Sequence, residues 1–188
     1  MNTQPHPSAG YPPAFVADIL DDMTGHGARC FALAGLQGTG KSTLSAQVAR
    51  LATQRGQTVV ALSIDDFYLG HEARQALGRS VHPLCATRGV PGTHDVELAC
   101  EVLDALREGR PVALPRFDKI ADDRLPRTQW PVVQDVDFVI FEGWFLHVPA
   151  QSPAEFERSI NADERELPDS ERPRNPQLAP GESPQNQG

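Results

Sequence analysis

A glycine-rich segment between an apolar run and a helical pattern constrains the fold of this chain more than any other feature. The segment 35–42, read as Gly-Leu-Gln-Gly-Thr-Gly-Lys-Ser, matches G-x-x-x-x-G-K-[ST]. It follows the apolar run 30–34 and precedes residues 43–52, where Leu44, Val48 and Leu51 recur at helical spacing. Strand, glycine-rich loop and helix in this order are the context in which the motif forms a P-loop.

The residue types of this segment suit the binding of phosphate groups. Glycines let backbone N–H groups close around phosphate oxygens, and the N-terminus of the following helix favours negative charge. Lys41 brings a positive charge to the β- and γ-phosphates, and the hydroxyl of Ser42 is a ligand for Mg²⁺. The predicted nucleotide-binding residues are Gly35, Gly38, Thr39, Gly40, Lys41, Ser42 and Thr43.

Apolar runs and helical patterns alternate along the chain. The runs 30–34, 58–64 and 137–141 are apolar almost throughout, which is typical of parallel strands buried on both faces. A shorter run, 111–114, follows a helical pattern that begins after Asp95. The alternation predicts an α/β fold, a P-loop NTPase three-layer sandwich with a central parallel sheet.

Charged residues directly follow several of these runs. Asp65 and Asp66 follow the second run, Arg116 follows the run 111–114, and Glu142 follows the last. Because parallel strands end at one edge of a sheet, we expect these groups to meet a ligand there. We predict Asp65 to be a general base and Glu142 to support Mg²⁺, directly or through water, so the predicted catalytic residues are Asp65, Lys41 and Glu142.

Two further segments, 87–95 and 115–124, combine charges with turn residues and are long enough to form substrate loops. Their arginines and lysine can bind a carboxylate or phosphate through charge-assisted hydrogen bonds. Asp95 is equally well explained as the N-cap of the next helix. The predicted substrate residues are Asp66, Tyr68, Arg88, His94, Asp95, Arg116, Lys119 and Arg124.

The composition limits the classes of partner. Lys and Arg number 17 against 25 Asp and Glu among 188 residues, a formal net charge of −8, which argues against a broad nucleic-acid or membrane surface. Cys30, Cys85 and Cys100 show no metal or disulfide spacing and are predicted to be core thiols of a reduced protein. With no signal peptide or membrane-spanning run, we expect a cytoplasmic protein that binds a small anionic substrate.

Proline content marks both ends of the chain. Residues 1–14 are rich in proline and small polar residues, and residues 151–188 contain six prolines with few apolar side chains. Such compositions bury too little apolar surface to offset the entropy lost on ordering. We expect a flexible arm over 1–14, a folded core over 15–150 and a disordered tail over 151–188.

Five segments in this order resemble the D-glycerate 3-kinase-like P-loop kinases, a group related to uridine, pantothenate and phosphoribulokinases. The segments are LAGLQGTGKST, SIDDFYL, TRGVPGTHDV, PRFDK and FEGWF, within about residues 30–150. The resemblance implies transfer of the γ-phosphoryl group from ATP, with Mg²⁺, to D-glycerate or a similar hydroxy acid. It also implies a base at Asp65 and substrate contacts at Arg88, His94, Asp95, Lys119 and Arg124.

A second interpretation stays open at this stage. In the family, the segment that matches FEGWF is followed by helices and an arginine-bearing lid, whereas this chain continues into the Pro- and Glu-rich residues 151–188. A lid excludes water and stabilises charge during phosphoryl transfer. The alternative is therefore a nucleotide-binding P-loop module with weak or no transfer activity. The oligomeric state does not follow from the sequence.

Overall fold

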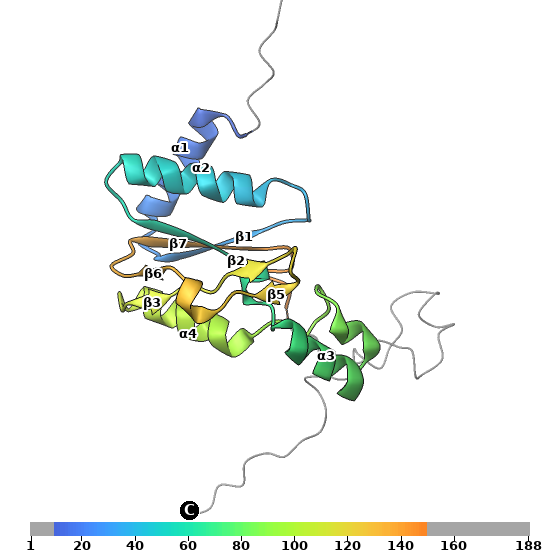
Figure 1. Cartoon of the computed structure of the whole chain (residues 1–188). Helices are drawn as coiled ribbons and strands as arrows, with labels where there is room; N and C mark the ends of the chain where they lie inside the picture. The colour runs from blue at the N-terminus through green and yellow to red at the C-terminus, as the bar shows by residue number, and fades with distance from the viewer. Residues whose placement is uncertain (1–9, 150–188) are drawn as a thin grey trace, which may run out of the picture.

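The computed structural model describes residues 10–149, which form a parallel three-stranded sheet with helices on both faces (Figure 1). The strands lie in the order β1 (Cys30–Ala34), β7 (Phe138–Gly143) and β2 (Val59–Ser63). Although β7 comes last in the sequence, it pairs in parallel with both other strands. The three strands therefore end at one edge, as expected for the predicted α/β fold.

The helices form the two outer layers. Helices α1 (Pro13–Gly25) and α2 (Lys41–Gln54) lie on one face of the sheet, and α4 (Val96–Arg107) lies on the other (Figure 1). The central strand β7 serves both cores, because Ile140 packs with the α1 and α2 residues whereas Val139 packs with those of α4. This alternation follows from the two-residue period of a strand. The three-layer sandwich is confirmed.

Shorter elements connect this scaffold. Helix α3 (His71–Ser80) follows a 3₁₀ turn over Ile64–Phe67 that continues β2, and two more such turns span Pro83–Ala86 and Arg127–Gln129. Two antiparallel pairs complete the structure: β3 (Val112–Ala113) with β6 (Val132–Val133), and β4 (Phe117–Asp118) with β5 (Asp123–Arg124).

The prediction that the run 111–114 adds a strand to the parallel sheet is wrong. Only Val112 and Ala113 are extended, and they pair with β6 outside that sheet. Proline at positions 111 and 115 flanks the pair, and proline cannot donate the backbone hydrogen bond that a ladder requires. Arg116 therefore does not follow a strand of the parallel sheet.

Strand β1 also departs from the expected burial on both faces. Phe31 and Leu33 pack toward the core of α1 and α2, whereas Cys30, Ala32 and Ala34 are exposed. Within residues 10–149, β1 pairs only with β7 and is an edge strand. The prediction of three core thiols is confirmed only for Cys85, which is buried. It is wrong for Cys30, which lies on the exposed face of this edge strand, and for Cys100, which is also exposed.

The structured region begins earlier than predicted. Tyr11 forms hydrogen bonds with Gln47, and α1 starts at Pro13, so residues 10–14 belong to the fold and not to a flexible arm. Residues 1–9 and the predicted tail 151–188 lie outside the described residues. No helix between residues 10 and 149 has the length and apolar character needed to cross a membrane.

Candidate active site

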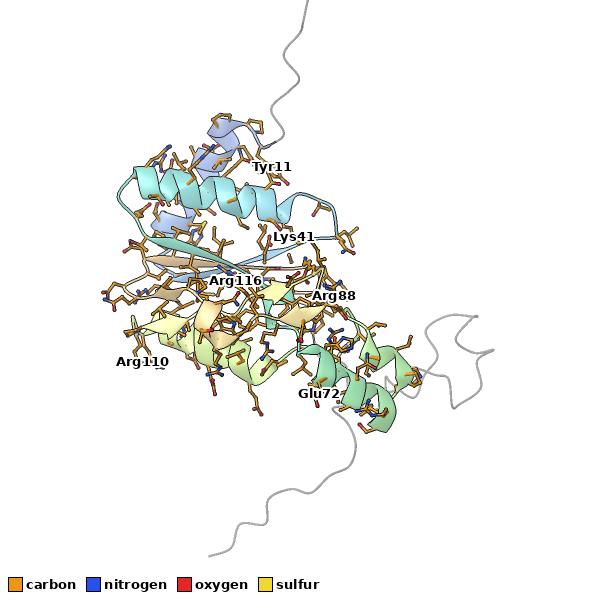
Figure 2. The ribbon with its side chains drawn as sticks, in the orientation of Figure 1. Tyr11, Lys41, Glu72, Arg88, Arg110 and Arg116 are labelled. Carbon is orange, nitrogen blue, oxygen red and sulfur yellow. The ribbon has the colours of Figure 1, made fainter. Side chains whose placement is uncertain are left out.

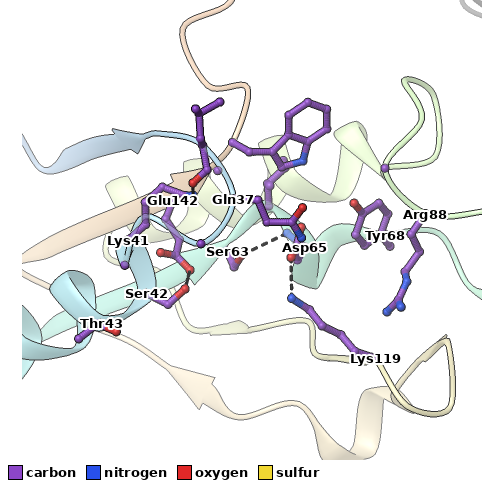
Figure 3. Close-up of a pocket in the computed structure, with 17 residues that line it drawn as sticks. Gln37, Lys41, Ser42, Thr43, Ser63, Asp65, Tyr68, Arg88, Lys119 and Glu142 are labelled. Atoms are coloured by element: carbon purple, nitrogen blue, oxygen red, sulfur yellow. Dashed lines mark hydrogen bonds and ion pairs between the residues drawn. The ribbon is translucent and has the colours of Figure 1, made fainter. Parts of the chain in front are cut away.

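A cavity of about 840 Å³ lies at the carboxyl ends of the three parallel strands (Figure 3). This edge of an open α/β sheet is where such folds bind ligands. Five separate segments contribute to its wall. The lining residues are Leu36, Gln37, Gly38, Gly40, Lys41, Ser42, Thr43, Ser63, Ile64, Asp65, Tyr68, Arg88, Gly89, Lys119, Glu142, Gly143 and Trp144.

The P-loop connects β1 to α2 on one side of this cavity. Gly38 and Gly40 have φ values of 79° and 87°, a left-handed conformation that favours glycine. Gly40 occupies the N-cap of α2 and has no side chain to satisfy the first N–H groups of that helix. The Nζ of Lys41 donates to the Leu36 carbonyl at 2.8 Å, across the loop. The loop therefore presents backbone donors and an ammonium group to an anion.

Glu142 and Ser42 meet beneath the P-loop. The Ser42 hydroxyl donates to Glu142 Oε1 at 2.6 Å (Figure 3). The Ser45 hydroxyl lies 3.5 Å from Oε2. Glu142 is only 7% exposed because it lies near the end of β7, the central strand. A hydroxyl and a carboxylate are both hard oxygen donors, which Mg²⁺ prefers and commonly combines with phosphate oxygens and water. These residues fit the predicted magnesium site.

Asp65 and Asp66 are adjacent in sequence but have different surroundings. Asp65 lines the cavity, and Lys119 Nζ donates to its Oδ2 at 2.6 Å (Figure 3). Asp66 lies behind the wall and accepts hydrogen bonds from Arg116 Nη1 and the Phe117 amide, each at 3.3 Å. Burial raises the pKa of Asp66, and Arg116 partly offsets this effect. Asp65 is thus the acid placed to meet a ligand, and Asp66 anchors the segment after β3.

The opposite side of the cavity carries the positive charges Arg88 and Lys119 beside Tyr68 (Figure 3). The Arg88 guanidinium lies 5.3 Å from the centroid of the Phe117 ring, and its Nε is 3.0 Å from Asp122 Oδ1. Asp65 lies between these cations and the P-loop. The cavity therefore has an anion-binding loop on one side, an acid in the middle and two cations on the other side.

The chain is similar to several known proteins. No family model matches the chain. It is 37% identical over 124 residues to the Schizosaccharomyces pombe protein named uncharacterized kinase mug58, and 36% identical over 122 residues to the chloroplastic D-glycerate 3-kinase of Arabidopsis thaliana. The solved structure of D-glycerate 3-kinase from Cryptococcus neoformans var. grubii has a TM-score of 0.62 at 29% identity.

The chain is homologous to this group of P-loop kinases. The matches to the S. pombe, Arabidopsis and Cryptococcus proteins cover 61%, 58% and 77% of this chain. They cover 45%, 26% and 55% of the relatives, so the chain spans about half or less of their length.

Several of the predicted substrate residues do not line the cavity. They support the residues that form its wall. Asp95 caps α4 by accepting from the Leu98 amide at 3.1 Å, and it also accepts from Arg124 Nη1 at 3.0 Å. Arg124 in turn donates to the Tyr68 carbonyl at 2.8 and 3.1 Å. His94 stacks on the Tyr68 ring at 4.1 Å. These residues hold Tyr68 in place, and a direct substrate contact at any of them stays a prediction.

Sequence reasoning missed the ionic cluster that anchors both cationic loops. The fully buried Arg74 donates to the carbonyls of Leu69, Ala86 and Asp122, and its Nη2 lies 3.0 Å from Asp122 Oδ2. Asp122, with a φ of 55°, also pairs with Arg88. The segment around Arg74 is mostly polar and reads as an exposed helix, so no local signal marks this arginine as buried.

Seven lining residues lie outside the predicted set, and Gln37 and Trp144 are two of them. Gln37 occupies a variable position of the P-loop motif, so its residue type carried no signal. Trp144 directly follows Glu142-Gly143 and belongs to one of the segments that resembles the family. Its position after a strand of the parallel sheet would have been sufficient to place it at the same edge.

Proposed function

We propose that the chain is an ATP-dependent kinase that transfers the γ-phosphoryl group of MgATP to a hydroxyl of D-glycerate or a similar small hydroxy acid. The observation that supports this most strongly is the content of a single cavity. The P-loop, Asp65 and the cations Arg88 and Lys119 all line it. This supports a reaction in which a nucleotide, a base and an anionic acceptor would lie within reach of one another.

The P-loop side would bind the nucleotide. Backbone N–H groups and the Lys41 ammonium would hold the β- and γ-phosphates, where the negative charge of the transferring group develops. Ser42 and Glu142 would hold Mg²⁺, which when bound neutralises charge on the phosphate oxygens. Glu142 is fixed for this task by β7 and by its hydrogen bond to Ser42.

Asp65 would act as the general base. Lys119 donates to Oδ2 of this carboxylate at 2.6 Å. Among residues 10–149 no side chain donates a hydrogen bond to Oδ1, so this oxygen would be the one that accepts a proton. As the acceptor oxygen bonds to the γ-phosphorus and the bond to the β-γ bridging oxygen breaks, the hydroxyl proton passes to Asp65. The products are ADP and the phosphorylated acid.

The two cations would select an acidic acceptor. Arg88 offers a planar guanidinium and Lys119 an ammonium group, both suited to a carboxylate, in a chain whose formal net charge is −8. Asp122 and Phe117 fix the Arg88 side chain through an ion pair and a cation–π contact. A small hydroxy acid bound by its carboxylate would place a hydroxyl near Asp65.

The test is ADP release by the full chain with MgATP, with and without D-glycerate, and Lys41→Ala serves as the blank. Asp65→Asn keeps the size of the side chain and removes the base, so kcat should fall about 10²- to 10⁴-fold while affinity for MgATP is retained. Release that D-glycerate and related acids do not stimulate, from a folded chain that binds MgATP, would refute the transfer reaction and favour a binding module.

A further inference from the structure

Tyr11 contacts the P-loop from a segment that precedes the first helix. Tyr11 lies beside α2 (Figure 2). Its hydroxyl donates to the Thr39 carbonyl at 2.8 Å. Its backbone is fixed on α2, because the Tyr11 amide donates to Gln47 Oε1 at 2.8 Å and Gln47 Nε2 donates to the Tyr11 carbonyl at 3.1 Å. The ring stacks on Phe15 of α1 with centroids 5.6 Å apart. The hydroxyl is therefore held on the loop by both neighbouring helices.

The hydrogen bond to Thr39 sets the direction of one P-loop amide. The peptide between Thr39 and Gly40 is planar and trans, so its C=O and N–H groups point in opposite directions. Gly40 lines the cavity, whereas Tyr11 does not. Because the Tyr11 hydroxyl fixes the carbonyl of this peptide, it also fixes the direction of the Gly40 N–H on the opposite side.

Close packing restricts this peptide further. Gly40 has a φ of 87°, and a Cβ built on it would lie 3.0 Å from the Tyr11 hydroxyl oxygen. Glycine peptides can rotate at little steric cost, so a P-loop of this kind gains order from an external hydrogen bond. Groups that are already oriented bind a ligand at a smaller entropy cost.

We propose that Tyr11 is a positioning residue for the phosphate groups of the nucleotide. It contacts neither nucleotide nor substrate, and it acts by orienting the Gly40 amide of the phosphate-binding loop. The inference rests on the nucleotide site of the proposed function and is independent of the acceptor. It requires an equal effect on every ligand that presents a diphosphate to the P-loop, with or without a base.

The test uses the full chain and the variant Tyr11→Phe, which removes the hydroxyl and keeps the ring. Dissociation constants for MgADP and for inorganic pyrophosphate with Mg²⁺ are measured by calorimetry. The loss of one neutral hydrogen bond should weaken both about two- to tenfold and by the same factor. Thr53→Val removes a hydroxyl that donates to the Ala49 carbonyl near the other end of α2, and it should bind both ligands as the wild type does.

The outcomes separate this inference from the proposed function. Unchanged affinity for pyrophosphate in Tyr11→Phe would overturn the positioning role, and so would a loss confined to MgADP, which would mean that Tyr11 acts on the nucleoside. A wild-type chain that binds both ligands but releases no ADP with D-glycerate would refute the transfer reaction alone. A wild-type chain that binds neither ligand would overturn both proposals.

Discussion

Acidification should destabilise this protein through His94. The imidazole is 8% exposed, stacks on Tyr68 and meets the edge of Phe145 at 5.4 Å. Its buried Nε2 has no hydrogen-bond partner within residues 10–149. Burial lowers the pKa of His94 from 6.5 to about 4, although the nearby Asp65 carboxylate acts in the opposite direction. The folded protein therefore holds His94 neutral under conditions that protonate it in the unfolded chain.

The sign and size of the effect follow from this difference. Between pH 6.5 and 4 the unfolded chain binds more protons than the folded protein, so the free energy of unfolding decreases as the pH falls. Well above pH 6.5 His94 is neutral in both states and does not reduce the free energy of unfolding. The reduction grows as the pH falls below 6.5 and is nearly complete once the pH is below about 4. At pH 5 the loss is about 2 kcal/mol, a large fraction of the stability of an ordinary domain.

Urea unfolding of the wild type and of His94→Phe, each at about pH 7.5 and about pH 5, measures this contribution. Phenylalanine keeps an aromatic ring between Tyr68 and Phe145 but cannot be protonated. The wild type should lose about 2 kcal/mol more than the variant between the two conditions. All other titratable groups are common to both proteins, so equal losses would show that His94 is not held neutral by burial.

Two further substitutions test the site and its support. Glu142→Gln removes a charge but keeps an oxygen acceptor for Ser42, and it should raise the Mg²⁺ concentration that nucleotide binding requires about 10- to 100-fold; a Mg²⁺ titration identical to the wild type would exclude Glu142 from the metal site. Arg74→Met leaves the carbonyls of Leu69, Ala86 and Asp122 without their buried donor, whereas the Asp122 carboxylate keeps Arg88, and the free energy of unfolding in urea should fall by about 2–3 kcal/mol. A cost below about 1 kcal/mol would show that the cluster around Arg74 is not structural.

The local elements that build the P-loop followed from the sequence. The glycines, Lys41 and Ser42 lie within one continuous segment, so their chemistry and their place between strand and helix depend only on near neighbours in the chain. The α2 and α4 helices followed in the same way from spacing, and the N-cap of α4 at Asp95 was one of two interpretations that the sequence left open. Asp65 could be placed at a strand end, because an apolar run directly precedes it.

Contacts between distant segments were decided only by the tertiary structure. The central place of β7 and the edge position of β1 depend on pairing across about a hundred residues, which an apolar run does not encode. Position after a strand does not by itself distinguish Asp65 from Asp66, and only the folded chain brings Lys119 to the first and Arg116 to the second.

The same reason explains the residues that sequence patterns missed. Tyr11 and Arg74 lie in segments that look like a polar arm and an exposed helix, and their partners Thr39 and Asp122 are 28 and 48 residues away. Local spacing reports which face of an element is apolar, but burial of a polar group depends on partners that other segments supply. The sequence by itself therefore determined the phosphate-binding loop and its helix, and the tertiary structure decided what surrounds and orients them.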